Sequence, residues 1–144
     1  MRKYCCLYIV AFVSLSCGEQ VSQEKDIEEI KIALNKCAED WSSGNIEAFM
    51  DVYWKSDKLQ FIGKNGINYG WTNALNNYKK KYPTPYHTGT LTFKVLSTDY
   101  LAKNLYSLTG EYYLRRKSSD LNGVFTLIFK KIDGKWVIVS DHTQ

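Results

Sequence analysis

The strongest constraint on the fold is a pattern of alternating apolar and polar residues in the C-terminal part of the chain. It fills four segments, at about 87–97, 100–116, 121–131 and 135–143, which the turn sequences STD, KSSD and IDGK separate. Alternation with a period of two predicts β-strands that bury one face. Because short turns join antiparallel neighbours, the four segments predict an antiparallel meander.

Helical spacing of apolar residues precedes these strands. It predicts helices over about 27–41, 46–53 and 71–82, with Asn45 as the N-cap of the second. Between the second and third helices, KLQFIG and GINYG predict a small hairpin around KNG. Three helices followed by a sheet indicate a single α+β domain over residues 26–144.

Residues 1–16 have the pattern of an export signal. A basic start is followed by an apolar run that is too short to span a bilayer. The sequence SLSCGEQ resembles the lipobox of bacterial lipoproteins, although Ser14 stands where that family prefers Leu. The resemblance implies cleavage before Cys17, lipidation of Cys17 and a tether up to residue 25, so that the protein is held by its lipid at a membrane of the cell envelope. Ordinary secretion, with a soluble periplasmic or secreted protein, is the alternative.

Charge and cysteine content limit the possible partners. The net charge of +4 at pH 7 falls to +2 without Arg2 and Lys3, so we expect no nucleic-acid partner. Cleavage before Cys17 would leave Cys37 as the only other cysteine, on the apolar stripe of the first helix, where we expect it to be buried. The chain has no HExxH, CxxC pair, phosphate-binding glycine loop or nucleophile elbow, and we expect neither a metal nor a cofactor.

Strand alternation assigns residues to a shared inner face of the predicted sheet. Pairing the strands outward from their turns predicts a core row of Leu91, Leu108, Phe129 and Ile138, a hollow row of Gly89, Gly110, Leu127 and Ser140, and a rim row of His87, Tyr112, Phe125 and His142. Two glycines in one row leave space above the sheet, so the hollow and rim rows predict a pocket with a polar mouth. The alternative is that the glycines mark bends and that His142 is a solvated strand end.

Three stretches, WSSGNIEAFMDVY, GINYGWTNALNNYKKKYP and GVFTLIFKKIDGKWVIVSDHT, resemble the nuclear transport factor 2-like superfamily. Within it they look like the small SnoaL-like bacterial domains of unknown function. The resemblance covers nearly all of residues 26–144. It implies a strongly curved antiparallel sheet wrapped around the helices as a cone with a pocket inside, commonly in a homodimer. The superfamily includes isomerases, cyclases, dehydratases and protein-binding modules, so the fold does not name an activity.

The resemblance has to be carried over residue by residue. Ketosteroid isomerases of this fold need an aspartate base in the pocket, whereas the predicted register puts Asp141 and Glu111 on the outer face. That placement argues against isomerase and cyclase chemistry. Dehydratases of this fold use a histidine pair with a tyrosine, which His87 and His142 resemble, but three strand spacings would separate these two by roughly 14 Å on a flat sheet.

These observations support three hypotheses. The first is a lipid-anchored cell-envelope domain that binds a small, largely apolar molecule between the hollow and rim rows. The second is an acid/base enzyme, dehydratase- or isomerase-like, that uses the same pocket with His142 or His87 as its catalytic group. The third is an interaction module that forms a homodimer through the outer face of the sheet, where Tyr113, Val124 and Val139 are expected.

Lipidation at Cys17 can be tested directly. Metabolic labelling with a fatty-acid analogue should label the wild-type protein and leave Cys17→Ser unlabelled, because serine cannot form the thioether to the lipid. Equal labelling of the two proteins would show that Cys17 is not the site of lipidation.

Overall fold

The computed structural model describes residues 16–144, with side chains described from Gln20 onward except that of Pro85. Residues 1–15 of the predicted signal peptide, and the side chain of Cys17, therefore lie outside the described residues. Within the described part, no helix is both long enough and apolar enough to cross a membrane.

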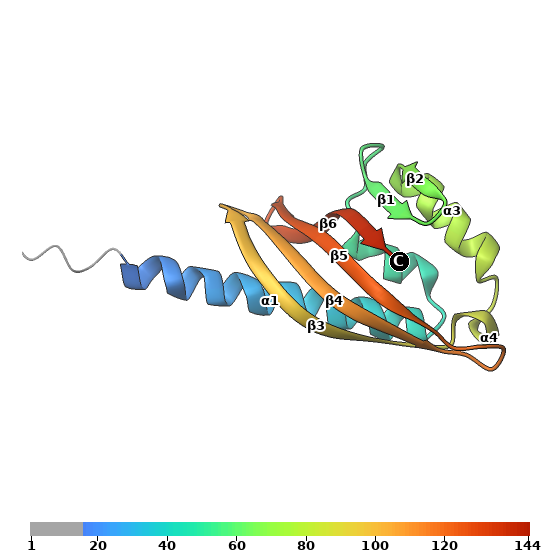
Figure 1. The fold of residues 1–144 in the computed structure, drawn as a ribbon. Helices are drawn as coiled ribbons and strands as arrows, with labels where there is room; N and C mark the ends of the chain where they lie inside the picture. Colours follow the sequence, from blue (N-terminus) through green and yellow to red (C-terminus); the bar gives the residue numbers. More distant parts are fainter. Residues whose placement is uncertain (1–15) are drawn as a thin grey trace, which may run out of the picture.

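The helices and strands follow one another in the order shown in Figure 1. The helical segments are α1 (Ser16–Ser42), α2 (Ile46–Phe49), the 3-10 turn η1 (Met50–Val52), α3 (Trp71–Lys81) and α4 (Pro85–Thr88). The strands are β1 (Gln60–Gly63), β2 (Gly66–Tyr69), β3 (Thr90–Ala102), β4 (Leu105–Arg115), β5 (Leu121–Ile132) and β6 (Lys135–Thr143). The described chain is thus α+β, with the long strands last, as the sequence predicts.

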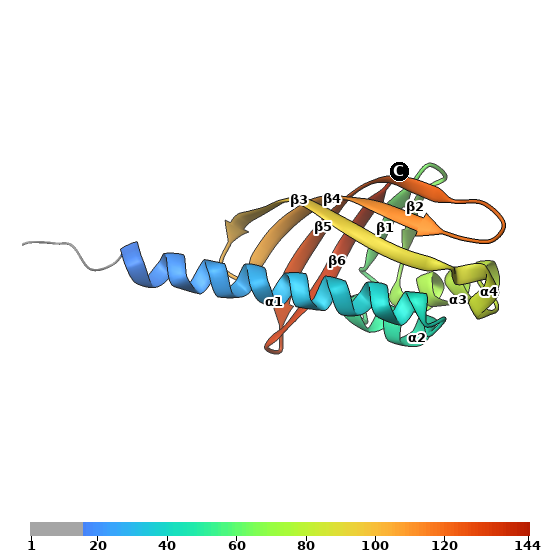
Figure 2. The same cartoon turned by 90° about the horizontal axis from the view of Figure 1, so that it is seen from below.

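All the strands belong to one curved sheet in the order β2-β1-β6-β5-β4-β3. The predicted hairpin is confirmed as β1 and β2, which pair antiparallel. The expectation of a purely antiparallel sheet is wrong, because β1 lies parallel to β6. Figure 2 shows α1 running across the concave side of the sheet, with α2, α3 and α4 gathered at one end of it. The helices therefore close the concave face and leave the convex face bare.

Helix α1 is longer than the sequence pattern predicts. It begins at Ser16, so the predicted tether is helical, and this first part projects beyond the sheet (Figure 1). Val21 there is 60% exposed. The segment has no apolar stripe to bury, but Glu, Gln and Lys are good helix formers, and a helix nucleated on the core at Ile30 and Leu34 extends through them at little cost.

A fourth short helix replaces the expected start of the first long strand. Pro85 lies at the N-terminus of α4, and Gly89 follows its last residue with φ 67°. Proline just inside a helix start and glycine just after its end are both helix signals. Consequently His87 and Gly89 do not belong to the sheet, and the indole of Trp41 donates a hydrogen bond of 2.9 Å to the carbonyl oxygen of Thr88, which ties α1 to α4.

A polar cluster fixes the middle of α1 to the sheet. The Lys131 ammonium lies 3.2 Å from a carboxylate oxygen of Asp26 and 2.9 Å from one of Glu29. The Trp136 indole also donates to Glu29 at 3.1 Å. The hydrogen bond from Lys131 lowers the pKa of Glu29, as expected for a stabilised carboxylate.

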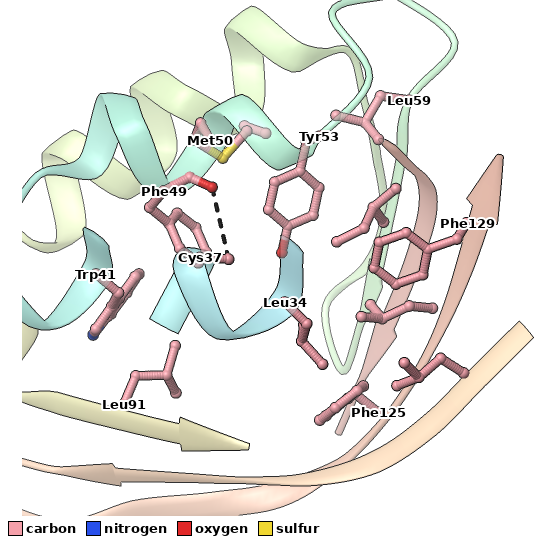
Figure 3. Close-up of a cluster of buried hydrophobic side chains, with 14 of the residues drawn as sticks. Leu34, Cys37, Trp41, Phe49, Met50, Tyr53, Leu59, Leu91, Phe125 and Phe129 are labelled. Carbon is pink, nitrogen blue, oxygen red and sulfur yellow. Dashed lines mark hydrogen bonds between the residues drawn. The ribbon is translucent and has the colours of Figure 1, made fainter. Parts of the chain in front are cut away.

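The hydrophobic core lies between α1 and the concave face of the sheet. Cys37 is buried there as predicted, and its thiol donates to the carbonyl oxygen of Phe49 at 3.7 Å (Figure 3). Burial raises the pKa of the thiol, so it remains protonated and unreactive at neutral pH.

Strand pairing departs from the predicted register. The predicted turn at STD lies inside β3, and the chain turns instead after Ala102, where Asn104 has φ 62°. Leu108 therefore lies opposite Leu127 and not opposite Phe129, whereas Phe129 and Ile138 pair as predicted. Because the shift between β4 and β5 is two residues, it preserves the assignment of their side chains to faces.

Three β-bulges interrupt the ladders. Leu96 and Leu101 are extra residues in β3, and Val139 is an extra residue in β6, between the pairs Phe129–Ile138 and Ile128–Ser140. A bulge of one residue reverses the faces of all side chains beyond it. The last residues of β6 therefore have the opposite orientation to the one that uninterrupted alternation predicts.

Candidate functional site

A cavity lies between the helices and the concave face of the sheet, and it has two adjoining compartments. The inner compartment has a volume of about 210 Å³ and the outer compartment about 560 Å³. Six residues line both compartments and form the junction between them: Tyr78, Lys81, Tyr112, Leu121, Asp141 and Thr143.

Apolar and aromatic side chains form the rest of the inner compartment. Helix α1 contributes Leu34 and Trp41, the segment after α2 contributes Tyr53, and β5 contributes Phe125 and Leu127. Figure 3 shows Tyr53 standing between Phe49 and Leu59, with its hydroxyl end toward Leu34. Among the described side chains of this wall, the polar atoms are the phenol oxygens and the indole nitrogen of Trp41, which already donates to the Thr88 carbonyl oxygen.

Among the described residues, Asp141 is the only acidic one that lines either compartment. Its side chain is buried, with 6% of the residue exposed. One carboxyl oxygen accepts a hydrogen bond of 3.0 Å from the Tyr53 hydroxyl, and the other accepts one of 2.5 Å from the Thr143 hydroxyl. Burial raises the pKa of Asp141 above its ordinary value of 3.8, although both hydrogen bonds act in the opposite direction.

The bulge at Val139 turns Asp141 inward. Beyond it Asp141 pairs with the buried Leu127, and His142 pairs with Thr126 on the outer face. The prediction that His142 faces the pocket is therefore wrong, and so is the prediction that Asp141 faces outward. His142 is exposed, and its Nε2 lies 3.2 Å from the side-chain nitrogen of Gln144.

The other predicted residues are divided between the cavity and the rest of the fold. Tyr112, Phe125 and Leu127 line the cavity as expected. Ser140 lies on the outer face, where it pairs with Ile128. His87 is exposed on α4, and its Nδ1 lies 2.7 Å from the Thr84 hydroxyl. The two histidines therefore do not form a site.

The two glycines of the hollow row do not open the cavity. A Cβ on Gly110 would lie 2.6 Å from the Phe125 ring and 2.8 Å from the carbonyl oxygen of Lys94, so the space above this glycine is already filled. A Cβ on Gly89 would lie 2.2 Å from the carbonyl oxygen of Arg115. Both glycines permit close packing of neighbouring atoms, so the hollow predicted above them is absent.

Aromatic rings connect Asp141 with the outer compartment. The ring centroids of Tyr53 and Phe61 are 4.9 Å apart, and those of Phe61 and Tyr78 are 5.9 Å apart. Burial raises the pKa values of Tyr53 and Tyr78 well above the ordinary value of 10.0, with Asp141 the next largest cause. Both phenols therefore stay protonated at neutral pH and can act as hydrogen-bond donors.

Sequence reasoning missed Asp141, Tyr53 and Tyr78 as site residues. Their arrangement offers a carboxyl group that can accept a proton or donate one, held by hydroxyl donors in an apolar surrounding. The expectation that no carboxylate faces inward is wrong, so the position of the acidic residues no longer speaks against isomerase- or cyclase-type chemistry. Among the described side chains, no group of three or more His, Cys, Asp or Glu residues is placed to hold a metal ion.

Comparison with known proteins gave matches among solved structures only, since neither the family models nor the curated proteins matched. An NTF2-like protein of unknown function from Shewanella oneidensis MR-1 is 33% identical, with 82% of this chain and 98% of that chain covered and a TM-score of 0.80. An NTF2-like superfamily protein from Salmonella enterica serovar Typhimurium LT2 is 17% identical. The match covers 89% of this chain and 92% of that chain, with a TM-score of 0.65. A hexachlorocyclohexane dehydrochlorinase, LinA type 2, is 13% identical, with 87% and 88% covered and a TM-score of 0.70, which shows a shared fold alone.

The burial of Asp141 predicts a specific pH dependence of stability. Because its folded pKa is raised, the folded state binds more protons than the unfolded state between the ordinary value of 3.8 and the folded pKa. The contribution of Asp141 is therefore most favourable below 3.8 and is lost as the pH rises through that window. Urea unfolding of wild type and Asp141→Asn should show wild type losing stability relative to the variant as the pH rises. A relative gain over the same range would contradict the burial of this carboxyl group.

Proposed function

Because the chain belongs to the nuclear transport factor 2-like family, we propose that it binds a small, largely apolar molecule in the cavity on the concave side of its sheet. The single observation that carries the proposal is the inner compartment, whose apolar and aromatic wall ends at the buried carboxyl group of Asp141. Ligand sites in proteins combine such walls with a few convergent polar groups. Asp141 takes the place that the sequence analysis gave to His142 and His87.

The size of the inner compartment suits a single substituted ring. A dry cavity of about 150 Å³ holds benzene, and the inner compartment measures about 210 Å³. The outer compartment, at about 560 Å³, gives room for the rest of a larger ligand. Phe93 and Tyr112 are only half-buried, so the ligand can gain apolar contact that the free protein lacks.

An acid/base enzyme at the same site is the second candidate. The observation that favours it is the raised pKa of Asp141, because a general base or acid works best with a pKa nearer to the working pH. Tyr53 would keep the carboxyl group in place and would itself donate to charge that develops on a substrate. The dehydrochlorinase among the structural neighbours offers a precedent for the fold and not for these residues. Mass spectrometry separates the two candidates, since a binding protein returns its ligand unchanged.

We also propose that this domain is a SnoaL-like member of the family, exported and held at the cell envelope by a lipid on Cys17. The sequence SLSCGEQ supports the anchor. A homodimer through the outer face of the sheet is a further proposal, and the exposure of Tyr113 at 42% and Val124 at 53% supports it. Light scattering of the domain from residue 22 onward tests the dimer.

Filling the junction should weaken binding strongly. Leu121 lines both compartments and is 37% exposed, so Leu121→Trp can place an indole there without overpacking the core. We expect at least a tenfold loss of affinity for N-phenyl-1-naphthylamine, a neutral apolar probe, measured by its fluorescence. Val124→Trp on the outer face of the same strand is the matched control and should bind like wild type. If the two variants bind the probe with equal affinity, the probe does not bind at the junction.

A further inference from the structure

The two compartments differ in chemistry. Apart from the junction, none of the described residues in the wall of the inner compartment is charged. The outer compartment instead has amide side chains from β1–β2, α3 and the end of the chain, namely Asn65, Asn68, Asn77 and Gln144, together with Lys64. A molecule that occupies both compartments therefore needs an apolar end and a polar end.

Lys81 supplies positive charge at the junction, since it lines both compartments from the end of α3. Its ammonium group lies 5.4 Å from the ring centroid of Tyr82 and has no carboxylate within ion-pair distance among the described residues. Two residues earlier on the same helix, Lys79 forms an ion pair with Glu47 at 2.5 Å. Lys64 also lacks an ion pair within the described part of the chain. The cavity thus presents two lysine ammonium groups that have no ion-pair partner among the described residues.

Asp141, the acidic residue at the junction, forms no ion pair with either lysine. Its two oxygens already accept hydrogen bonds from Tyr53 and Thr143. Burial also favours its neutral form. Lys81 is thus a charged group at the junction that has no ion-pair partner among the described residues, and a carboxylate placed beside it would be attracted to its ammonium group.

We propose that the cavity selects amphipathic carboxylates, with an aromatic or branched apolar group in the inner compartment and the carboxylate beside Lys81 at the junction. The inference rests on the proposed function and adds the charge of the ligand to it. An organic ammonium is the opposite possibility, because aromatic walls and an aspartate can bind cations. The two lysines and the occupied oxygens of Asp141 favour the anion.

Three naphthalene compounds of the same shape and different charge test this selection: 2-naphthoate, 2-naphthamide and 2-naphthylmethylammonium. Their affinities can be measured at neutral pH by displacement of N-phenyl-1-naphthylamine. We expect the carboxylate to bind about fivefold more tightly than the amide, and the ammonium to bind most weakly, since a partly exposed ion pair contributes at most a modest gain.

Two methionine variants assign the effect to one lysine. In Lys81→Met, which keeps the apolar stem, the carboxylate should lose its advantage while the affinity for the amide stays unchanged. Lys80→Met is the matched control, because Lys80 is exposed on α3 and does not line the cavity. The control should keep the wild-type preference, and added salt should reduce the preference in wild type.

The outcomes separate the inference from the proposed function. If the amide and the neutral probe bind but the carboxylate has no advantage, or the ammonium binds best, the charge selection is overturned and the binding site stands. An equal loss for carboxylate and amide in Lys81→Met would also overturn it, because Lys81 would then act through packing. If neither the probe nor any naphthalene compound binds, the proposed function fails and the inference fails with it.

Discussion

The backbone of β6 has one residue more than the part of β5 opposite it, at Val139, and the cavity depends on this bulge. Before it, Trp136 and Ile138 are buried against α1 and the core. After it, Asp141 and Thr143 face the cavity. On the edge of β6 away from β5, β1 pairs in parallel with the end of β6, and Phe61 lies opposite Asp141. One backbone irregularity thus brings a carboxyl group under the aromatic rings of the helical layer.

Burying this carboxyl group is unfavourable unless its hydrogen bonds compensate. An unpaired charged group in an apolar interior costs several kcal/mol or shifts its pKa until it is neutral. Tyr53 and Thr143 provide a donor for each oxygen, and the remaining cost appears as the raised pKa. An apolar residue at position 141 would avoid this cost. A buried polar group that lowers stability in an otherwise apolar wall is typical of a functional site.

Much of the fold follows from short-range patterns in the sequence. Alternation identified all four long strands, and the turn at Asp133–Gly134 has the positive φ values, 50° and 76°, that its residues favour. Tyr112, Phe125 and Leu127 were assigned to the inner face correctly even though the pairing of β4 with β5 was displaced. Faces repeat every two residues, and that displacement was two residues.

The site itself could not be predicted in the same way. A bulge leaves no mark in the alternation of a strand as short as β6, so counting from Ile138 puts His142 inside and Asp141 outside. The hydrogen bond from Tyr53 joins residues 88 positions apart, and no local pattern indicates it. The sequence does contain helix signals for α4, with Pro85 at its start and Gly89 after its end. The predicted strand nevertheless began at residue 87 and therefore included part of this helix.

The most direct test is the pKa of the Asp141 carboxyl group, measured by carbon-detected NMR with assignment from Asp141→Asn. The account predicts a value above the ordinary 3.8, because the group is buried, and a further rise in Tyr53→Phe, where a donor that stabilises the charged form is lost. A pKa at or below the ordinary value that does not respond to Tyr53→Phe would mean that Asp141 faces solvent. The bulge, the site and the function proposed for it would then be wrong.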